Sequence, residues 1–153
     1  MGQRRVELLA VAFLGVLIAT AAALAPGDAG AQEDPLKARQ AGFKDISREM
    51  KAAEGLVKAG GPGDRIAEHA VKMTAFLQRV PSLFPPGSDK GSSEAKKEIW
   101  SNFDDFVKLA RAAAAEGEKL VVVAKANKIA DTRKQFAALG DACSACHDKY
   151  RNE

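Results

Sequence analysis

The chain has 153 residues, a formal net charge of +3 at pH 7, two cysteines and 6% aromatic residues. This length suits one domain with one core, and abundant alanine, lysine and glutamate favour helices over strands. The basic residues are interspersed with acidic ones and do not alternate with aromatic residues, so the composition argues against nucleic acid as a partner.

The first 31 residues have the pattern of an export signal. Two arginines precede an uncharged run over residues 8–24, and a small-x-small pattern ends at Ala31. We therefore expect a signal peptide over residues 1–31 and a mature periplasmic domain over residues 32–153 that is not attached to the membrane. An uncleaved anchor is the alternative, because an apolar run of this length is at the lower limit for spanning a bilayer.

The first two helices are predicted from their ends and their apolar stripes. Asp34-Pro35 offers a capping residue and a proline at the first helical position, and the glycines around Pro62 end this helix. One position of its apolar stripe is taken by Arg39, which is therefore expected to point inward. A second helix, capped by Asp64, should stop at the loop over residues 81–91, which contains three prolines and two glycines.

The second half of the chain predicts two further helices. Ser92 or Ser93 is expected to open the third, which ends near Gly117, and the fourth runs from Glu118 towards Arg151. Four helices with two tight links and one longer loop predict an all-α fold, an antiparallel up-down-up-down four-helix bundle. A three-helix array, with the last helix interrupted near residues 131 and 132, is the alternative.

The chemistry is carried by Cys143-Ser144-Ala145-Cys146-His147, the C-x-x-C-H sequence that attaches c-type haem. Each thiol can add to one haem vinyl group, and the histidine that follows can bind the iron. We predict one haem c bound covalently through Cys143 and Cys146, with His147 as the iron ligand. The alternatives are a redox-active C-x-x-C, a local disulfide, and half of a zinc site for which only His69 remains as a further histidine ligand.

With these residues the chain resembles cytochrome c′, the class II c-type cytochromes, whose haem lies at the C-terminal end of a four-helix bundle. The resemblance covers nearly all of the mature chain and includes the attachment motif continued to Arg151, Arg39 with Phe43, and Glu98-Ile99-Trp100 after the proline-rich loop. The stretch over residues 115–140 is longer than usual for the family, which bears on the boundary of the fourth helix. The resemblance implies a homodimer packed through the first two helices.

The resemblance also implies roles for individual residues. Phe43 occupies the sixth-ligand position, where low-spin relatives carry methionine, and phenylalanine cannot coordinate iron. Arg39, on the same helix face, resembles the arginine that pairs with a haem propionate, and Arg151 resembles an arginine near the proximal face. Trp100 is expected to line the haem edge. From the residues alone, Phe43 and Trp100 also suit an ordinary core, and both arginines also suit a solvated surface.

These residues predict an exported haem protein with five-coordinate, high-spin iron and an apolar distal pocket, which binds NO or CO and transfers electrons or buffers nitric oxide. No acid, base or nucleophile constellation surrounds Phe43, so an enzyme is not expected. The redox partner is unknown. One alternative is a six-coordinate, low-spin electron carrier in which Met50 or His69 closes the site, and another is an exported helical protein without haem.

Overall fold

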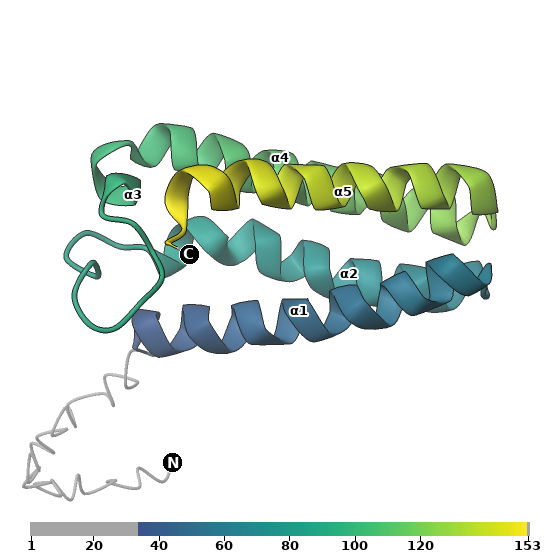
Figure 1. The fold of residues 1–153 in the computed structure, drawn as a ribbon, viewed down its shortest axis with the longest axis horizontal. Helices are drawn as coiled ribbons and strands as arrows, with labels where there is room; N and C mark the ends of the chain where they lie inside the picture. The colour runs from purple at the N-terminus through teal and green to yellow at the C-terminus, as the bar shows by residue number, and fades with distance from the viewer. Residues whose placement is uncertain (1–33, 153) are drawn as a thin grey trace, which may run out of the picture. The chain divides into compact units, whose positions relative to one another are not determined.

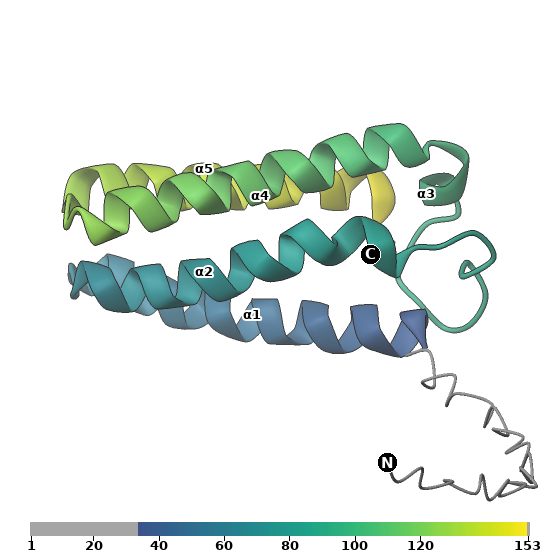
Figure 2. The same cartoon turned by 180° about the vertical axis from the view of Figure 1, so that it is seen from behind.

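The computed structural model describes residues 34–152, which form an all-α bundle (Figures 1 and 2). The expected signal peptide and its cleavage point lie outside these residues. The elements are α1 (Pro35–Ala59), α2 (Gly63–Arg79), the 3-10 turn η1 (Val80–Leu83), α3 (Glu98–Ser101), α4 (Phe103–Lys125) and α5 (Ile129–Tyr150). The four long helices alternate in direction, which confirms the predicted bundle, and α5 is unbroken at residues 131 and 132, which excludes the three-helix array.

Both ends of α1 follow from the chemistry of its terminal residues. Asp34 Oδ1 accepts a hydrogen bond from the backbone N–H of Leu36 at 2.9 Å, and Pro35 occupies the first turn, where no helical hydrogen bond needs its N–H. At the other end Gly60 has a φ of 65°, and the N–H groups of Gly60 and Gly61 bond carbonyls of the last turn. This left-handed conformation favours glycine. The predicted ends of the first helix are confirmed.

The start of α2 differs from the prediction. Pro62 occupies the capping position, α2 begins at Gly63, and Asp64 lies in the first turn without bonding a free backbone N–H. A carboxylate in the first turn still interacts favourably with the helix dipole, so the acidic residue was recognised but its role as the cap was wrong. A Cβ at Gly63 would overlap the carbonyl oxygen of Ala124. Glycine at this position therefore lets the start of α2 pass against the end of α4.

Gly63→Ala is expected to lower the free energy of unfolding by about 2 kcal/mol, because the added methyl meets backbone rather than a flexible side chain. Gly55→Ala is the matched control. Nothing lies within 4 Å of a Cβ at this exposed position of α1, so the substitution should stabilise the protein by roughly 0.5–1 kcal/mol. Urea denaturation followed by circular dichroism measures both changes. Equal effects of the two substitutions would contradict the close approach at Gly63.

The predicted third helix is divided into two helices. The single turn α3 ends at Asn102, whose backbone φ of −127° and ψ of 43° interrupt the helix before α4 begins at Phe103. The prediction that Ser92 or Ser93 opens this helix was wrong, because both lie in the preceding loop. Ser93 Oγ accepts a hydrogen bond from the backbone N–H of Ala95 at 3.1 Å. Serine makes such local bonds in turns as well as at helix starts, so the sequence signal was ambiguous.

The predicted boundary between the third and fourth helices was also wrong. α4 continues through Gly117 to Lys125, and α5 begins at Ile129. Gly117 is buried, and a Cβ there would overlap Thr74 Oγ1. The glycine therefore marks a close contact between α2 and α4 rather than a helix end. The chain turns instead at Asn127, whose φ of 51° is a conformation that asparagine tolerates better than most residues.

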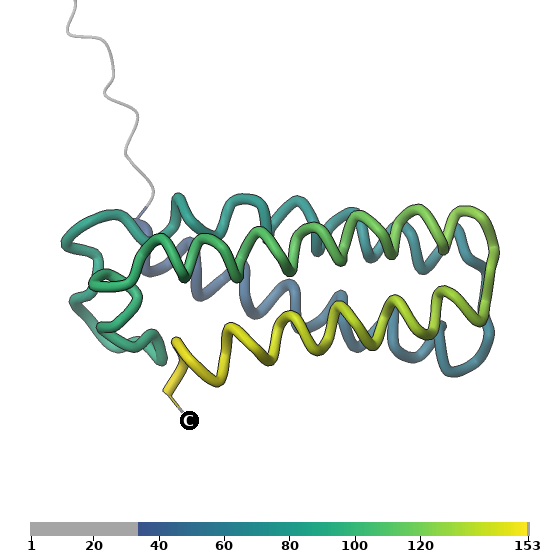
Figure 3. Tube along the Cα trace, turned by 90° about the horizontal axis from the view of Figure 1, so that it is seen from above, coloured from purple at the N-terminus to yellow at the C-terminus, as the bar shows by residue number. Residues whose placement is uncertain are grey.

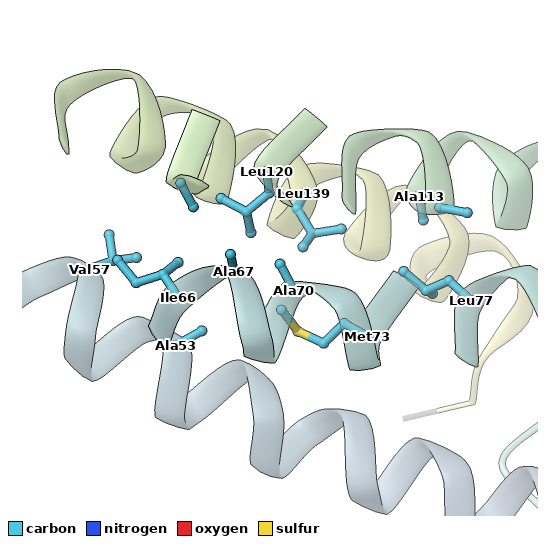
Figure 4. Packing of buried hydrophobic residues seen from close by; sticks show 12 residues of the cluster. Ala53, Val57, Ile66, Ala67, Ala70, Met73, Leu77, Ala113, Leu120 and Leu139 are labelled. Carbon is cyan, nitrogen blue, oxygen red and sulfur yellow. The ribbon is translucent and has the colours of Figure 1, made fainter. Parts of the chain in front are cut away.

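The middle of the bundle holds the larger apolar core, which we call the central core (Figure 4). Its buried members come from all four long helices and are Ala53, Val57, Ile66, Ala67, Ala70, Met73, Leu77, Ala113, Ala114, Leu120, Ala124 and Leu139. Half of them are alanines, so the helices approach closely and interlock around a few larger side chains. Among residues 34–152, no helix is long and apolar enough to cross a membrane.

Candidate haem-attachment site

The last turns of α5 carry the predicted attachment residues. Cys143 and Cys146 are free thiols and half-buried, whereas His147 is exposed and Tyr150 is buried. Cys143 packs against the central core, and Cys146 packs against a second apolar cluster. His147 lies four positions after Cys143, which is little more than one helical turn. One short stretch of α5 therefore presents two sulfurs and an imidazole.

Burial sets the protonation of these groups. Loss of hydration raises the pKa of the Cys143 thiol, and loss of hydration together with the neighbouring Cys143 and a nearby carboxylate raises the pKa of Cys146 to about 11. Partial desolvation of the imidazole lowers the pKa of His147, and the charge of Arg151 lowers it further. At neutral pH the imidazole is thus neutral, the form that binds metals. A thiol kept protonated is a poor nucleophile, which argues against a redox-active C-x-x-C.

A second apolar cluster lies at the end of the bundle where α1 begins and α5 ends (Figure 1). Its buried members are Val80, Leu83, Phe84, Ile99, Phe106, Ala110 and Tyr150, with Ala38, Phe43, Phe76, Ala95, Trp100, Leu109 and Cys146 packed against them and partly buried. We call this set the end cluster. It brings together Phe43 of α1, Trp100 of α3 and Cys146 of α5. From the far end, where Arg133 Nε donates to the carbonyl of Val57, α1 and α5 diverge towards the end cluster (Figure 3).

Two phenylalanine rings form the part of the end cluster contributed by α1 and α2. The ring centroids of Phe43 and Phe76 are 5.1 Å apart, with an angle of 82° between the ring planes. This edge-to-face geometry is favourable for aromatic pairs. Phe76 also covers Gly42, where a Cβ would overlap its ring. Sequence analysis missed Phe76, although its position three residues after Met73 puts it at the edge of the apolar stripe of α2.

Arg39 points inward, as predicted, and is only 2% exposed. Its Nη1 donates to the carbonyl of Leu83 at 3.3 Å, and its Nη2 donates to the carbonyl of Ser88 at 2.8 Å. The guanidinium carbon lies 4.8 Å from the ring centroid of Phe84 and 5.7 Å from that of Trp100. The alternative, that this side chain extends to solvent, was therefore wrong. Arg39 ties the loop after α2 to α1 beside the aromatic residues of the end cluster.

One donor of Arg39 has no partner. Its Nε is buried without a hydrogen-bond acceptor, and no carboxylate among residues 34–152 forms an ion pair with the guanidinium. A buried donor left unpaired costs about 1–3 kcal/mol, so an acceptor is expected here. A haem propionate offers both an acceptor and a negative charge. The two thiols, the neutral imidazole and this unpaired donor therefore fit a c-type haem.

The residues after His147 are tied to the loop that precedes α3. Arg151 Nε pairs with Glu94 Oε2 at 2.7 Å, and the backbone N–H of Lys96 donates to the carbonyl of Tyr150 at 2.9 Å. The Arg151 side chain is exposed, as expected for a surface residue, yet its backbone N–H bonds the carbonyl of His147 and its charge lowers the pKa of that imidazole. Arg151 is thus close to His147, and its backbone pairs with that of Ala95, a member of the end cluster, in an isolated β-bridge.

The residues of the competing interpretations lie elsewhere. Met50 packs against the central core and not against the end cluster. His69 Nδ1 lies 2.6 Å from Glu49 Oε2, in a contact between α1 and α2. Within the described part of the chain, no three His, Cys, Asp or Glu side chains are grouped to hold a metal ion. The zinc, disulfide and six-coordinate alternatives therefore gain no support.

Comparisons with known proteins point to one family. The profile described as Cytochrome C′ matches residues 34–151. Cytochrome c′ from Pararhodospirillum photometricum is 33% identical over 115 residues, which cover 74% of this chain and 92% of that protein. The crystal structure of cytochrome c′ from Thermochromatium tepidum has a TM-score of 0.74 at 28% identity. The match covers 78% of this chain and 95% of the chain in that structure. A nitric oxide complex of a cytochrome c prime variant from Alcaligenes xylosoxidans has a TM-score of 0.71 at 28% identity. The match covers 79% of this chain and 95% of that protein.

Proposed function

The chain belongs to the cytochrome c′ family of c-type haem proteins, and we propose that it is an exported cytochrome that binds nitric oxide or carbon monoxide at a single haem. Cys143 and Cys146 form the two thioether links, and His147 binds the iron. When bound, haem supplies an iron site for diatomic ligands and for exchange of one electron. The observation that carries this proposal is the set of two half-buried thiols and one imidazole beside the end cluster.

On the side opposite His147 we propose that the chain provides no iron ligand. Phe43 and Phe76, which belong to the same cluster as Cys146, carry neither a lone pair for iron nor a hydrogen-bond donor. Iron is then five-coordinate and high-spin. Bound dioxygen gains stability from a nearby donor, whereas nitric oxide and carbon monoxide do not need one. An apolar wall therefore favours the latter two ligands.

The remaining site residues hold and orient the cofactor in this proposal. Arg39 directs its unpaired Nε to a haem propionate, for which a guanidinium has suitable charge and geometry. Trp100 contributes to the wall of the pocket while its Nε1 donates to the carbonyl of Pro85 at 3.0 Å. Loss of hydration lowers the pKa of the His147 imidazole, and the charge of Arg151 lowers it further. None of these groups acts as an acid, a base or a nucleophile, so we propose gas binding or electron transfer and no enzymatic reaction.

Residues 1–31 are proposed to direct export, and residues 32–153 to form the mature periplasmic domain. We further propose that this domain is a homodimer and exchanges electrons with a redox partner that its sequence does not identify. Nitric oxide buffering is the role that suits an iron site open to gas ligands in this compartment.

Ferric absorption and electron paramagnetic resonance spectra of the purified mature protein test the proposal. We expect a Soret band, a high-spin ferric signal at neutral pH, and a changed ferrous spectrum on addition of nitric oxide or carbon monoxide. A low-spin ferric signal would overturn the open iron site and favour a six-coordinate electron carrier. A mass equal to that of the polypeptide alone, with no Soret band, would overturn the assignment of haem.

A further inference from the structure

Tyr150 is a buried phenol that the proposed function does not use. It is the single tyrosine of the chain, and it lies at the end of α5 with 3% of its surface exposed, as a member of the end cluster. Cys146 lies four positions earlier in α5, so the two side chains share one face of this helix. Because Cys146 is one of the two proposed attachment points, the phenol lies about one helical turn from a covalent link to the haem.

The Tyr150 hydroxyl has a proton acceptor in place. It donates to Asp105 Oδ2 at 2.7 Å, whereas the backbone carbonyl of Asn102 is 3.4 Å away. A hydrogen bond from a hydroxyl to an ionised carboxylate is shorter and stronger than one between neutral groups. Asp105 belongs to the start of α4, which lies at the same end of the bundle as the end of α5 (Figure 1). The packing of α4 against α5 therefore supplies the phenol with a base.

Asp105 connects this buried phenol to the solvent. Its side chain is 43% exposed, and Lys149 Nζ donates to the same carboxylate oxygen at 2.7 Å. Hydrogen bonds from Lys149 and Tyr150 lower the pKa of Asp105, while burial and the bond to Asp105 raise the pKa of Tyr150. At neutral pH the pair is thus a neutral phenol and a carboxylate. A proton can pass along this hydrogen bond, and the exposed carboxylate can then release it to water.

We propose that Tyr150 donates one electron to the haem when a hydroperoxide oxidises it, with Asp105 as the proton acceptor. An iron site without a sixth ligand is open to a hydroperoxide as well as to a diatomic gas. Cleavage of the O–O bond of hydrogen peroxide to give two waters takes two electrons, and two protons from the solvent. One electron comes from the ferric haem and the other from Tyr150, whose O–H proton passes to Asp105 and leaves a neutral tyrosyl radical. This inference rests on the haem assignment of the proposed function.

Trp100, the single tryptophan of the chain, is the competing electron donor in the end cluster, and its surroundings oppose its oxidation. Its Nε1 donates to the backbone carbonyl of Pro85 at 3.0 Å, and a carbonyl is a much weaker base than a carboxylate. The guanidinium carbon of Arg39 lies 5.7 Å from the Trp100 ring centroid. A positive charge so close disfavours a ring that has lost an electron but kept its proton. The local chemistry therefore favours Tyr150.

Rapid-freeze electron paramagnetic resonance of the haem-loaded ferric protein, mixed with hydrogen peroxide, tests the inference. We expect a tyrosyl radical whose hyperfine splitting changes when ring-deuterated tyrosine is incorporated, and with a single tyrosine in the chain this signal belongs to Tyr150. Tyr150→Phe keeps the ring that packs against Phe106 and should abolish the signal and hasten loss of the Soret band under peroxide. Circular dichroism confirms folding, and absence of a Soret band before peroxide is added would overturn the haem assignment itself.

Asp105→Asn tests the proton acceptor. The amide has the size of the carboxylate but takes up no proton at neutral pH, so the tyrosyl radical should form about 100-fold more slowly. Asp104→Asn is the matched control and should leave the rate unchanged, because Asp104 is exposed and forms no hydrogen bond with Tyr150 within the described residues. Three results would overturn the inference: no tyrosyl radical in protein with an intact Soret band, an unchanged radical in Tyr150→Phe, or equal slowing by the two asparagine variants.

Discussion

Replacement of both Cys143 and Cys146 with serine should yield a folded helical protein that carries no covalently bound haem. A thioether requires a thiol, and these two are the only cysteines of the chain. A hydroxyl of nearly the same size keeps the half-buried positions filled, so the helical circular dichroism should be retained. Mass spectrometry and haem staining after denaturing electrophoresis, on protein matured in a host that attaches c-type haem, measure the result. The expected loss of attached haem is complete.

Ser144→Ala is the control for this experiment. Ser144 lies between the cysteines on the exposed side of α5 and makes no hydrogen bond through its side chain within the described residues, so attachment should be unaffected. Persistence of covalent haem in the double serine variant would refute the assignment of Cys143 and Cys146. Loss of haem in Ser144→Ala as well would show that maturation, and not thiol chemistry, had been disturbed.

Phe43→Met should convert the ferric iron from high-spin to low-spin. The family resemblance implies that Phe43 lies at the position where low-spin relatives carry methionine, and it packs against Phe76 and the end cluster that includes Cys146. Methionine has a similar volume, rotates freely and offers a thioether that ligates c-type haem. If the methionine closes the site in 99% of molecules, the apparent affinity for carbon monoxide falls by about 100-fold. Electron paramagnetic resonance and carbon monoxide titration measure the two effects.

Phe43→Leu separates ligation from packing. Leucine also removes the aromatic contact with Phe76 but supplies no ligand atom, so the iron should remain high-spin and open to gas ligands. Met50→Leu should likewise leave the spectrum unchanged, because Met50 packs against the central core. A low-spin signal in Phe43→Leu, or a change of spin state in Met50→Leu, would mean that another residue of the chain reaches the iron.

Prediction succeeded where neighbours in sequence decide the structure. The Asp34 cap and the Gly60 turn are local events, and both ends of α1 were predicted from them. Gly117 shows the limit of this reasoning. In sequence it resembles a helix end, yet it lies inside α4 because Thr74 of α2 leaves no room for a Cβ. A glycine signals either a turn or a close approach, and only the position of the neighbouring helix distinguishes them.

In the candidate site, too, features set by neighbours in sequence could be predicted, whereas features set by contacts between helices could not. That the two thiols and the imidazole lie together on the last turns of one helix could be predicted, because their spacing along the chain is little more than one helical turn. Arg39 was expected inside because it interrupts an apolar stripe, but its partners in the loop after α2, and its unpaired Nε, follow from a loop that no periodicity describes. Phe76 escaped notice because its proximity to Phe43 depends on how α2 packs on Gly42.

The sequence by itself thus determined the helical class, the number of long helices, the haem-attachment motif and the inward arginine, since each depends on residue spacing along one helix. Only the tertiary structure decided where α4 ends, which aromatic residues meet at the end cluster, and how closely α2 approaches α4 at Gly63 and Gly117. Those features depend on the distances between helices, which are set by the packing of side chains distant in sequence.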